Sequence, residues 1–431
     1  MLTAFGRAFK TPDLRRKILF TLFIIGIYRL GSFIPGPGVS YVAIQRALES
    51  TEGDTLYGLV NLFSGGALLQ LSIFALGIMP YITASIILQL LVVVIPRLEE
   101  LKKEGQAGQA KITQYTRYLT IALAVLQSTG IIALARSGRL FPDPSIEVIP
   151  DDSLVRILVL IVTMTAGTAV IMWLGELITD RGVGNGMSVL IFTSIISSIP
   201  GQAVRLWQSE NGPVTVVAIA LLALIVITLV VYVEQAQRRI PVQYAKRMIG
   251  RRAYGGTSTY IPLKVNQAGI IPVIFASSLL YLPQLLSNVW TSNAGFTRFI
   301  NEYLVNPSSF VYLGLYFALI VFFTFFYVAI TFNPVEVSDN MKKYGGFIPG
   351  IRPGRATAEY LDYILSRITS FGAVYLGLVA VLPYLLFGLT GAGEQIPFGG
   401  AAILIIVGVG LETVKQIESQ LMLRNYEGFL R

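Results

Sequence analysis

The sequence has no cysteine, no histidine and little charge for its length. Without cysteine, its 431 residues form no disulfides, iron–sulfur clusters or thiolate metal sites. Without histidine, the chain lacks the commonest metal ligand and the usual general base. Only 13% of the residues are charged and 54% are apolar, whereas soluble domains carry about 25% charge. These features exclude an ordinary soluble enzyme, and we expect no cofactor and no bound metal.

The sequence contains several long apolar runs. A membrane-spanning helix needs about 20 predominantly apolar residues. Ten such runs occur, at residues 18–35, 71–95, 119–135, 154–178, 187–204, 214–233, 268–286, 311–332, 371–389 and 401–421. The fifth and the tenth run are interrupted by polar residues. We therefore expect an all-α polytopic membrane protein with ten transmembrane helices.

Lysine and arginine are distributed unevenly among the connections between the runs. If the N-terminus lies inside, 25 of them fall in inner segments and 5 in outer connections. An excess of basic residues in short cytoplasmic loops sets the orientation of membrane proteins. The sequence predicts that both termini are cytoplasmic.

Two inner segments, residues 234–266 and 333–370, are larger than a connection requires. The first contains three basic pairs, at positions 238 and 239, 246 and 247, and 251 and 252. The second contains Lys342, Lys343 and a turn-rich stretch around Arg352. These loops could simply orient the chain and touch lipid headgroups. Alternatively, they form a docking surface for a large anionic partner such as ribosomal RNA or an acidic protein.

A short sequence recurs in the two halves of the chain. Residues 77–90 match residues 269–282, which lie 192 positions later, at eight of fourteen positions. Each copy falls in the second span of a five-span half, and because five is odd the halves must face opposite ways. Glycine and proline in corresponding spans of an inverted repeat point to the working site. A chance match of abundant apolar residues is the alternative.

The stretch before the first copy is too long for one span. From Leu56 to Ile95 there are 40 residues, about 60 Å as a helix, which is twice the hydrocarbon thickness. A half-length element that dips in from the outer side accommodates this length if protein or a water-filled cavity surrounds it. A helix lying at the membrane interface is the alternative.

Ionisable side chains are sparse within the runs. Arg29 is the only charge well inside one, and the second and third runs contain uncharged polar residues. Ion-coupled transporters usually place Asp, Glu or His at mid-membrane, and no such cluster occurs. The glycine-rich residues 182–186 lack the lysine of a phosphate-binding loop and indicate a flexible connection. Periodicity alone leaves a passive polypeptide channel and a secondary solute transporter close to even, with a membrane-embedded enzyme third. The large basic loops and the neutral, isoleucine-rich repeat favour the channel.

Several specific motifs decide between these alternatives. They lie at residues 61–69, 72–82, 103–105, 114–118, 172–176, 181–186, 237–241, 262–266, 332–334, 347–354 and 424–428. From residue 14 to the C-terminus the chain resembles the SecY family, the channel-forming subunits of the bacterial Sec protein translocase. The resemblance implies a protein-conducting channel of the bacterial plasma membrane without catalytic residues. It also implies an hourglass pore between halves 1–206 and 207–431, with a lateral exit between spans two/three and seven/eight.

The resemblance further implies roles for particular residues. The pore constriction matches Ile78, Ile82, Met187, Ile191, Ile274 and Ile405. Methionine at 187 departs from the family, in which isoleucine is common there. Independently, the spacings 78/82 and 187/191 place each pair on one helix face. We also assign three polar residues of spans two and three to the lateral gate: Thr83, Gln89 and Gln127.

The family's plug corresponds to about residues 57–69, as a re-entrant half-length helix. We expect its key residues to be Asn61, Phe63, Ser64, Gly65, Gly66 and Leu68. The basic docking surface corresponds to Arg238, Arg239, Lys246, Arg247, Arg251, Arg252 and Arg352. The partners implied are SecE- and SecG-like small membrane subunits, the SecA motor, the ribosome, signal peptides and nascent chains, and phospholipids.

Overall fold

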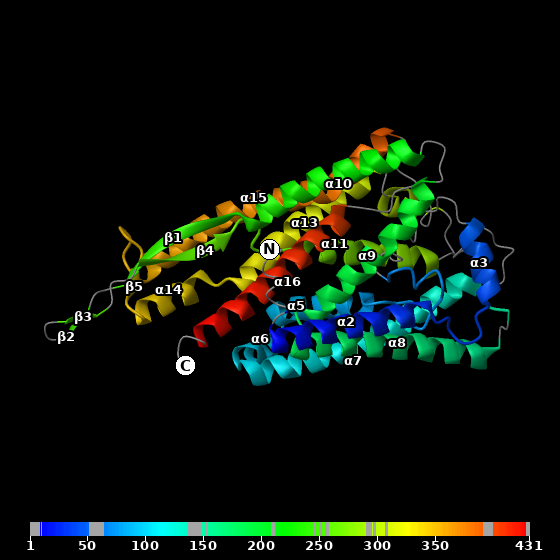
Figure 1. Cartoon of the computed structure of the whole chain (residues 1–431), viewed down its shortest axis with the longest axis horizontal. Coiled ribbons are helices and arrows are strands. Elements are labelled where there is room, and N and C mark those ends of the chain that lie inside the picture. Colours follow the sequence, from blue (N-terminus) through cyan, green and yellow to red (C-terminus); the bar gives the residue numbers. More distant parts are fainter. Residues whose placement is uncertain are drawn as a thin grey trace.

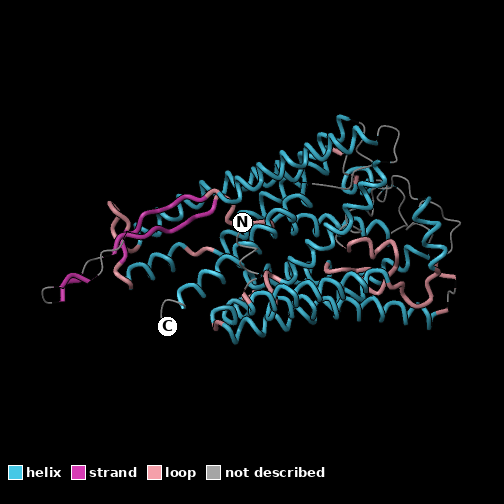
Figure 2. The backbone as a smooth tube through the Cα atoms, in the orientation of Figure 1, coloured by secondary structure: helices cyan, strands magenta, loops and turns pink. Residues whose placement is uncertain are grey.

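The computed structural model describes residues 9, 11–50, 64–136, 148–150, 153–207, 212–244, 247–249, 252–254, 258–289, 295, 299–306, 309–390 and 400–427. Most helices extend along the long axis of the molecule, and the strands are confined to one end of it (Figures 1 and 2). The helix α6 and the end of α16 lie toward this same end (Figure 1).

Apart from turns and loops, the described part of the first half of the chain is helical. Its helices are α2 (Pro12–Phe33), α3 (Tyr41–Ser50), α5 (Met79–Val94), α6 (Pro96–Lys103), α7 (Gln106–Arg136), α8 (Leu154–Arg181) and α9 (Gly186–Trp207).

The second half combines helices with short strands. Its elements are α10 (Gly212–Gln235), β1 (Gln237–Tyr244), β2 (Arg247–Ile249), β3 (Arg252–Tyr254), β4 (Ser258–Lys264), α11 (Ile271–Val289), the π-helix η1 (Ile300–Val305), α13 (Phe310–Thr331), α14 (Pro334–Lys343), β5 (Gly346–Phe347), α15 (Arg355–Thr390) and α16 (Gly400–Glu427).

Each of the ten predicted apolar runs overlaps a helix. These helices are α2, α5, α7, α8, α9, α10, α11, α13, α15 and α16. Among the described residues, five helices are long and apolar enough to cross a membrane, or six if the bent pair α5 and α6 counts as one span. The helical, polytopic architecture is confirmed, and the number of ten spans stays a prediction.

The second predicted run is helical over only part of its length. Residues 71–78 form turns, and α5 begins at Met79. Leu71 and Gly77 have φ angles of 44° and 54°, which a right-handed helix does not accept. Pro80 lies in the first turn of α5, where its missing N–H costs nothing. With 16 residues, α5 is about 24 Å long.

A bend separates α5 from α6. The two helix axes differ by 100°. Pro96 opens α6, and the preceding Ile95 is extended, with φ −99° and ψ 109°. Proline disfavours the helical conformation in the residue before it, so the chain turns at this point. The helix α6 therefore lies across the direction of α5.

The two large basic loops fold together into one unit, which the sequence did not predict. Strand β1 pairs antiparallel with β4 of its own loop and with β5 of the other. Ile240, Leu263, Met341 and Leu361 share a separate hydrophobic core beneath this sheet. The predicted loop 333–370 is also partly helical, because α15 begins at Arg355 and α14 precedes it. With 36 residues, α15 is about 54 Å long, so it spans both the bundle and this unit.

Candidate functional site

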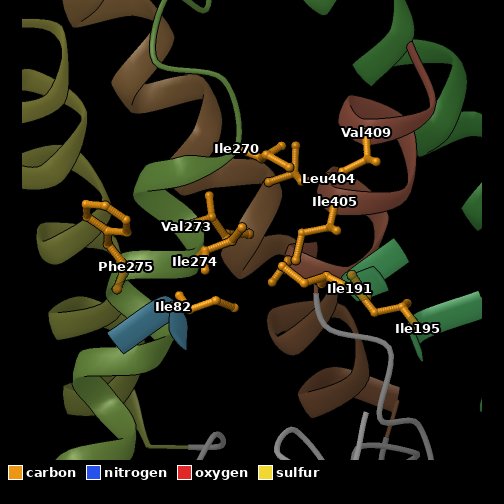
Figure 3. Packing of buried hydrophobic residues seen from close by; sticks show 14 of the residues in the cluster. Ile82, Ile191, Ile195, Ile270, Val273, Ile274, Phe275, Leu404, Ile405 and Val409 are labelled. Atoms are coloured by element: carbon orange, nitrogen blue, oxygen red, sulfur yellow. The ribbon is translucent and has the colours of Figure 1, made fainter. Parts of the chain in front are cut away.

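The six predicted constriction residues lie together in the structure. Ile78, Ile82, Ile191, Ile274 and Ile405 are buried in the largest hydrophobic cluster, and the half-buried Met187 packs against it. Figure 3 shows Ile82, Ile191, Ile274 and Ile405 meeting from α5, α9, α11 and α16.

This meeting point is apolar and closed. The side chain of Ile405 is 0% exposed and that of Ile191 is 3% exposed, so neither contacts solvent. Branched apolar side chains that exclude water block ions, which would lose their hydration on entering. The arrangement has the chemistry of a hydrophobic seal and lacks that of a coordination site.

The internal sequence repeat is also a repeat of local structure. Gly77 and Gly269 both adopt a left-handed backbone, with φ 54° and 63°. A helix starts two residues after each glycine, α5 at Met79 and α11 at Ile271. This shared geometry argues against a chance match, and the two helices contact each other.

The repeat identifies a residue that the sequence motifs did not single out. Ile270 occupies the position of Ile78 in the second copy. It is buried in the same cluster, and a Cβ added to Gly408 of α16 would lie 2.7 Å from its Cγ2. Ile270 is thus packed closely against the backbone of α16. Alignment of the two copies of the repeat identifies Ile270 from the sequence.

The described part of the predicted plug is a series of turns, so the prediction of a helix is wrong for residues 64–69. Ser64, Gly65, Gly66 and Leu68 lie in these turns, while Asn61 and Phe63 fall outside the described residues. The φ angles of Gly65 and Gly66 are 66° and 90°. Two successive left-handed residues interrupt a right-handed helix.

The turn segment, defined as residues 64–71, is packed into the N-terminal half. Ser64 and Leu68 are buried, and the Ser64 Oγ accepts a hydrogen bond from the Leu68 N–H at 3.1 Å. Leu68 and Leu71 belong to a second hydrophobic cluster with residues of α3, α7 and α8. The segment is therefore packed into a hydrophobic cluster of its own, separate from the constriction cluster.

Two of the three predicted lateral-gate residues form hydrogen bonds within their own helix. Thr83 Oγ1 donates to the Met79 carbonyl at 3.0 Å, and Gln89 Nε2 donates to Ser85 Oγ at 3.3 Å. Both bonds lie within α5, because a side chain reaches the preceding helical turn without help from a neighbour. Gln127 is buried on α7. Helices α5 and α7 both contact α11, where the lateral exit is predicted.

Asn266 shapes the start of α11. It is buried, and its Nδ2 donates to Glu234 Oε1 at 2.5 Å and to the Gly269 carbonyl at 3.0 Å. It thereby connects the end of α10 to the left-handed glycine of the repeat. In the sequence, Asn266 was only the last residue of a loop motif.

The glycine-rich connection at residues 182–186 forms hydrogen bonds with two distant helices, and its predicted flexibility stays a prediction. The Val183 N–H donates to Thr21 Oγ1 on α2 at 3.1 Å, and the Gly184 N–H donates to Gln416 Oε1 on α16 at 2.9 Å. These bonds tie elements from opposite ends of the sequence together. A Cβ added to Gly182 or Gly186 would lie 2.7 Å or 1.8 Å from a backbone oxygen of α8, so these glycines allow close approach.

Part of the predicted docking surface is exposed on the sheet. Arg238 and Arg239 are exposed on β1, and the Arg239 guanidinium carbon lies 4.9 Å from the centre of the Tyr260 ring on β4. Arg247 and Arg252 lie in the paired strands β2 and β3. Lys246 and Arg251 lie outside the described residues.

Arg352 occupies the loop that the sequence predicted. It is exposed between Gly350 and Gly354, whose φ angles are 83° and 103°. The Arg352 carbonyl accepts a hydrogen bond from Thr357 Oγ1 at 2.9 Å, and the Gly354 carbonyl accepts one from Ser338 Oγ at 2.7 Å. The backbone of the loop is fixed while the guanidinium projects outward.

Comparison with known proteins gives consistent results. The SecY family model matches residues 72–414. The chain is 65% identical to the protein translocase subunit SecY of Streptomyces scabiei and 59% identical to that of Mycobacterium tuberculosis, each over 100% of both chains.

Two solved channel structures show the same fold. The first, in which the plug domain of a SecY protein is described as stabilising the closed state and maintaining a membrane seal, has a TM-score of 0.64 at 19% identity. The second is Sec61 in the canine ribosome-channel complex, with a TM-score of 0.62 at 18% identity. Each alignment covers 94% of this chain and 91% of the other. By its family model, its full-length relatives and its fold, the chain belongs to the SecY family of protein translocase subunits.

Proposed function

We propose that this protein is the protein-conducting channel through which unfolded secretory polypeptides cross the membrane. The observation that carries the proposal is the buried meeting point of α5, α9, α11 and α16, formed by Ile82, Ile191, Ile274 and Ile405. A ring of apolar side chains seals against ions when empty and has no fixed polar contacts that would select one polypeptide sequence. A solute transporter would need polar groups at this point, and these positions have none.

The two halves of the pore, 1–206 and 207–431, are related by the repeat that starts at Gly77 and Gly269. The lateral exit lies where α5 and α7 face α11 and α13. The contacts of α11 with α5, α7 and α13 support this placement. A transmembrane segment of the passing polypeptide leaves for the lipid by this route.

We further propose that the energy for transport comes from partners and that the chain catalyses no covalent reaction. The sheet of β1, β4 and β5 and the Arg352 loop present basic side chains that suit the SecA motor or the ribosome. A ribosome-bound Sec61 is among the proteins of the same fold, which supports the ribosome as a partner. SecE- and SecG-like subunits, signal peptides and phospholipids complete the expected partners.

The protein is a multi-pass membrane protein, and we place it in the bacterial plasma membrane with both termini in the cytoplasm. The lysine and arginine distribution favours this orientation. The end of α16 and the basic sheet lie toward the same end of the molecule (Figure 1), as the orientation requires.

Site-specific crosslinking tests the channel function. A photo-reactive residue replaces Ile82, and a secretory polypeptide is stalled midway through transport. We expect a crosslink to the stalled chain at Ile82 and none at Val162, which is exposed on α8 away from the constriction cluster. Labelling at Val162 alone, or labelling that is independent of the stalled chain, would exclude a pore at Ile82.

A further inference from the structure

Arg29 is a charged residue in an otherwise apolar part of α2. It lies four positions before the end of that helix, and its side chain is half-buried. Among the described residues, no acidic side chain forms an ion pair with it. A charge within a membrane span is costly and usually has a function.

The guanidinium of Arg29 contacts the turn segment directly. Its Nη1 donates a hydrogen bond to the Gly65 carbonyl oxygen at 2.5 Å. Its Cζ lies 4.6 Å from the centre of the Phe33 ring, one helical turn further on. The aromatic ring fixes the position of the cation, and the cation binds a backbone oxygen of the segment.

Gly65 is packed between α2 and α9. A Cβ added to Gly65 would lie 3.2 Å from Arg29 Nη1, from Ser194 Cα and from Ser197 Oγ. Next to Gly65, the Tyr28 and Ser194 hydroxyls share a hydrogen bond of 2.6 Å, which connects α2 to α9. The segment is therefore held at one backbone carbonyl, and a side chain at position 65 would press on Arg29, Ser194 and Ser197.

We infer that Arg29 is a positioning residue that holds the turn segment, residues 64–71, in the closed position of the channel. This inference rests on the proposed channel function. Because Arg29 binds a backbone carbonyl, this contact does not depend on which side chains the segment carries. The simpler alternative is an arginine that extends to the nearest headgroups and stabilises α2 alone. The two alternatives differ in what happens to the segment when Arg29 is replaced.

Disulfide trapping measures the docking of the segment directly, because the chain has no cysteine of its own. Cysteines replace Gly65 and Ser197 in the full-length protein, with Arg29 retained or changed. Hydrogen bonds to charged groups commonly shift an equilibrium by about tenfold or more. We expect Arg29→Met to slow disulfide formation by about tenfold and Arg29→Lys, which retains a charged donor, to slow it much less. The backbone strain of cysteine at position 65 is common to all three proteins. The contact of its Cβ with the Arg29 guanidinium exists only where arginine is retained. Because this contact disfavours docking in the parent, it works against the expected difference and cannot produce it.

Ion leak from proteoliposomes gives the functional readout. We expect Arg29→Met to raise the leak several-fold and the 65–197 disulfide to return it to the parent level. Arg156→Met is the matched control, because Arg156 lies beside the loop that follows α2, with its Cδ 3.8 Å from a Cβ added to Gly38. An unchanged trapping rate in folded Arg29→Met protein would overturn the inference, as would a leak that the disulfide fails to close. Since trapping requires no transport, it also remains decisive if the channel function itself fails its test.

Discussion

Arg117 on α7 donates two hydrogen bonds to Glu176 on α8, from Nε to Oε1 and from Nη2 to Oε2, each 2.8 Å long. The two residues are 59 positions apart in the sequence. Their side chains are 39% and 24% exposed, and Arg117 also donates to Gln114 on its own helix. This two-pronged ion pair joins the third and fourth predicted spans at one end.

We expect Glu176→Gln to lower the free energy of unfolding by about 1–2 kcal/mol, because it removes a charge-assisted, bidentate interaction. Thermal unfolding in detergent measures the loss. The exposed pair Arg355–Glu359 is the control, and Arg355→Gln should cost less than about 0.5 kcal/mol. Exchange of the partners, Arg117→Glu with Glu176→Arg, should recover part of the loss. Equal losses of unfolding free energy in Glu176→Gln and Arg355→Gln would contradict the prediction.

Simultaneous replacement of Ile78, Ile82 and Ile274 by serine should raise ion conductance several-fold in proteoliposomes. Hydroxyl groups admit water to the constriction and weaken the hydrophobic barrier. The control carries three serines at Val155, Leu158 and Val162, which are exposed along α8. Conductance that stays at the parent level in the first variant would remove these isoleucines from the pore.

Gly269→Ala should destabilise the protein by about 1–2 kcal/mol. The φ angle of Gly269 is 63°, and an added Cβ would meet no atom within 4 Å, so the cost is backbone strain alone. Gly314 of α13 has equally open space but a helical backbone, and Gly314→Ala should be neutral or stabilise by up to about 1 kcal/mol. Thermal unfolding of both variants tests the difference. A harmless Gly269→Ala would show that the repeat does not require a left-handed residue there.

Arg352→Glu should weaken binding of SecA or the ribosome by about two- to tenfold at low salt, without change of topology. Exposed charges act over about 8–10 Å near physiological ionic strength, and each exposed pair contributes little. Arg355→Glu is the matched control, since Arg355 is also exposed and lies three residues away. Equal weakening in both variants would indicate nonspecific attraction, and unaltered binding in Arg352→Glu would restore the orienting interpretation of the loops.

Local patterns in the sequence determined much of this protein. Twenty apolar residues in a row have few stable alternatives to a helix in lipid, so the positions of the helices followed from composition. The repeat at Gly77 and Gly269 predicted matching local structure, because glycine and proline constrain the backbone wherever they stand. The motifs around Ile78 and Ile82 led to the family.

Contacts between distant segments were decided only by the tertiary structure. Arg29 and Gly65, Arg117 and Glu176, and the strands β1 and β5 come together from parts of the chain that share no local pattern. Turns replaced the predicted helix at residues 64–69, because Gly65 and Gly66 are both left-handed and Gly65 is packed between α2 and α9. A hydrogen bond or a packed surface depends on where both partners lie in space. Periodicity specifies which face of a helix is apolar, and only the folded chain specifies what that face contacts.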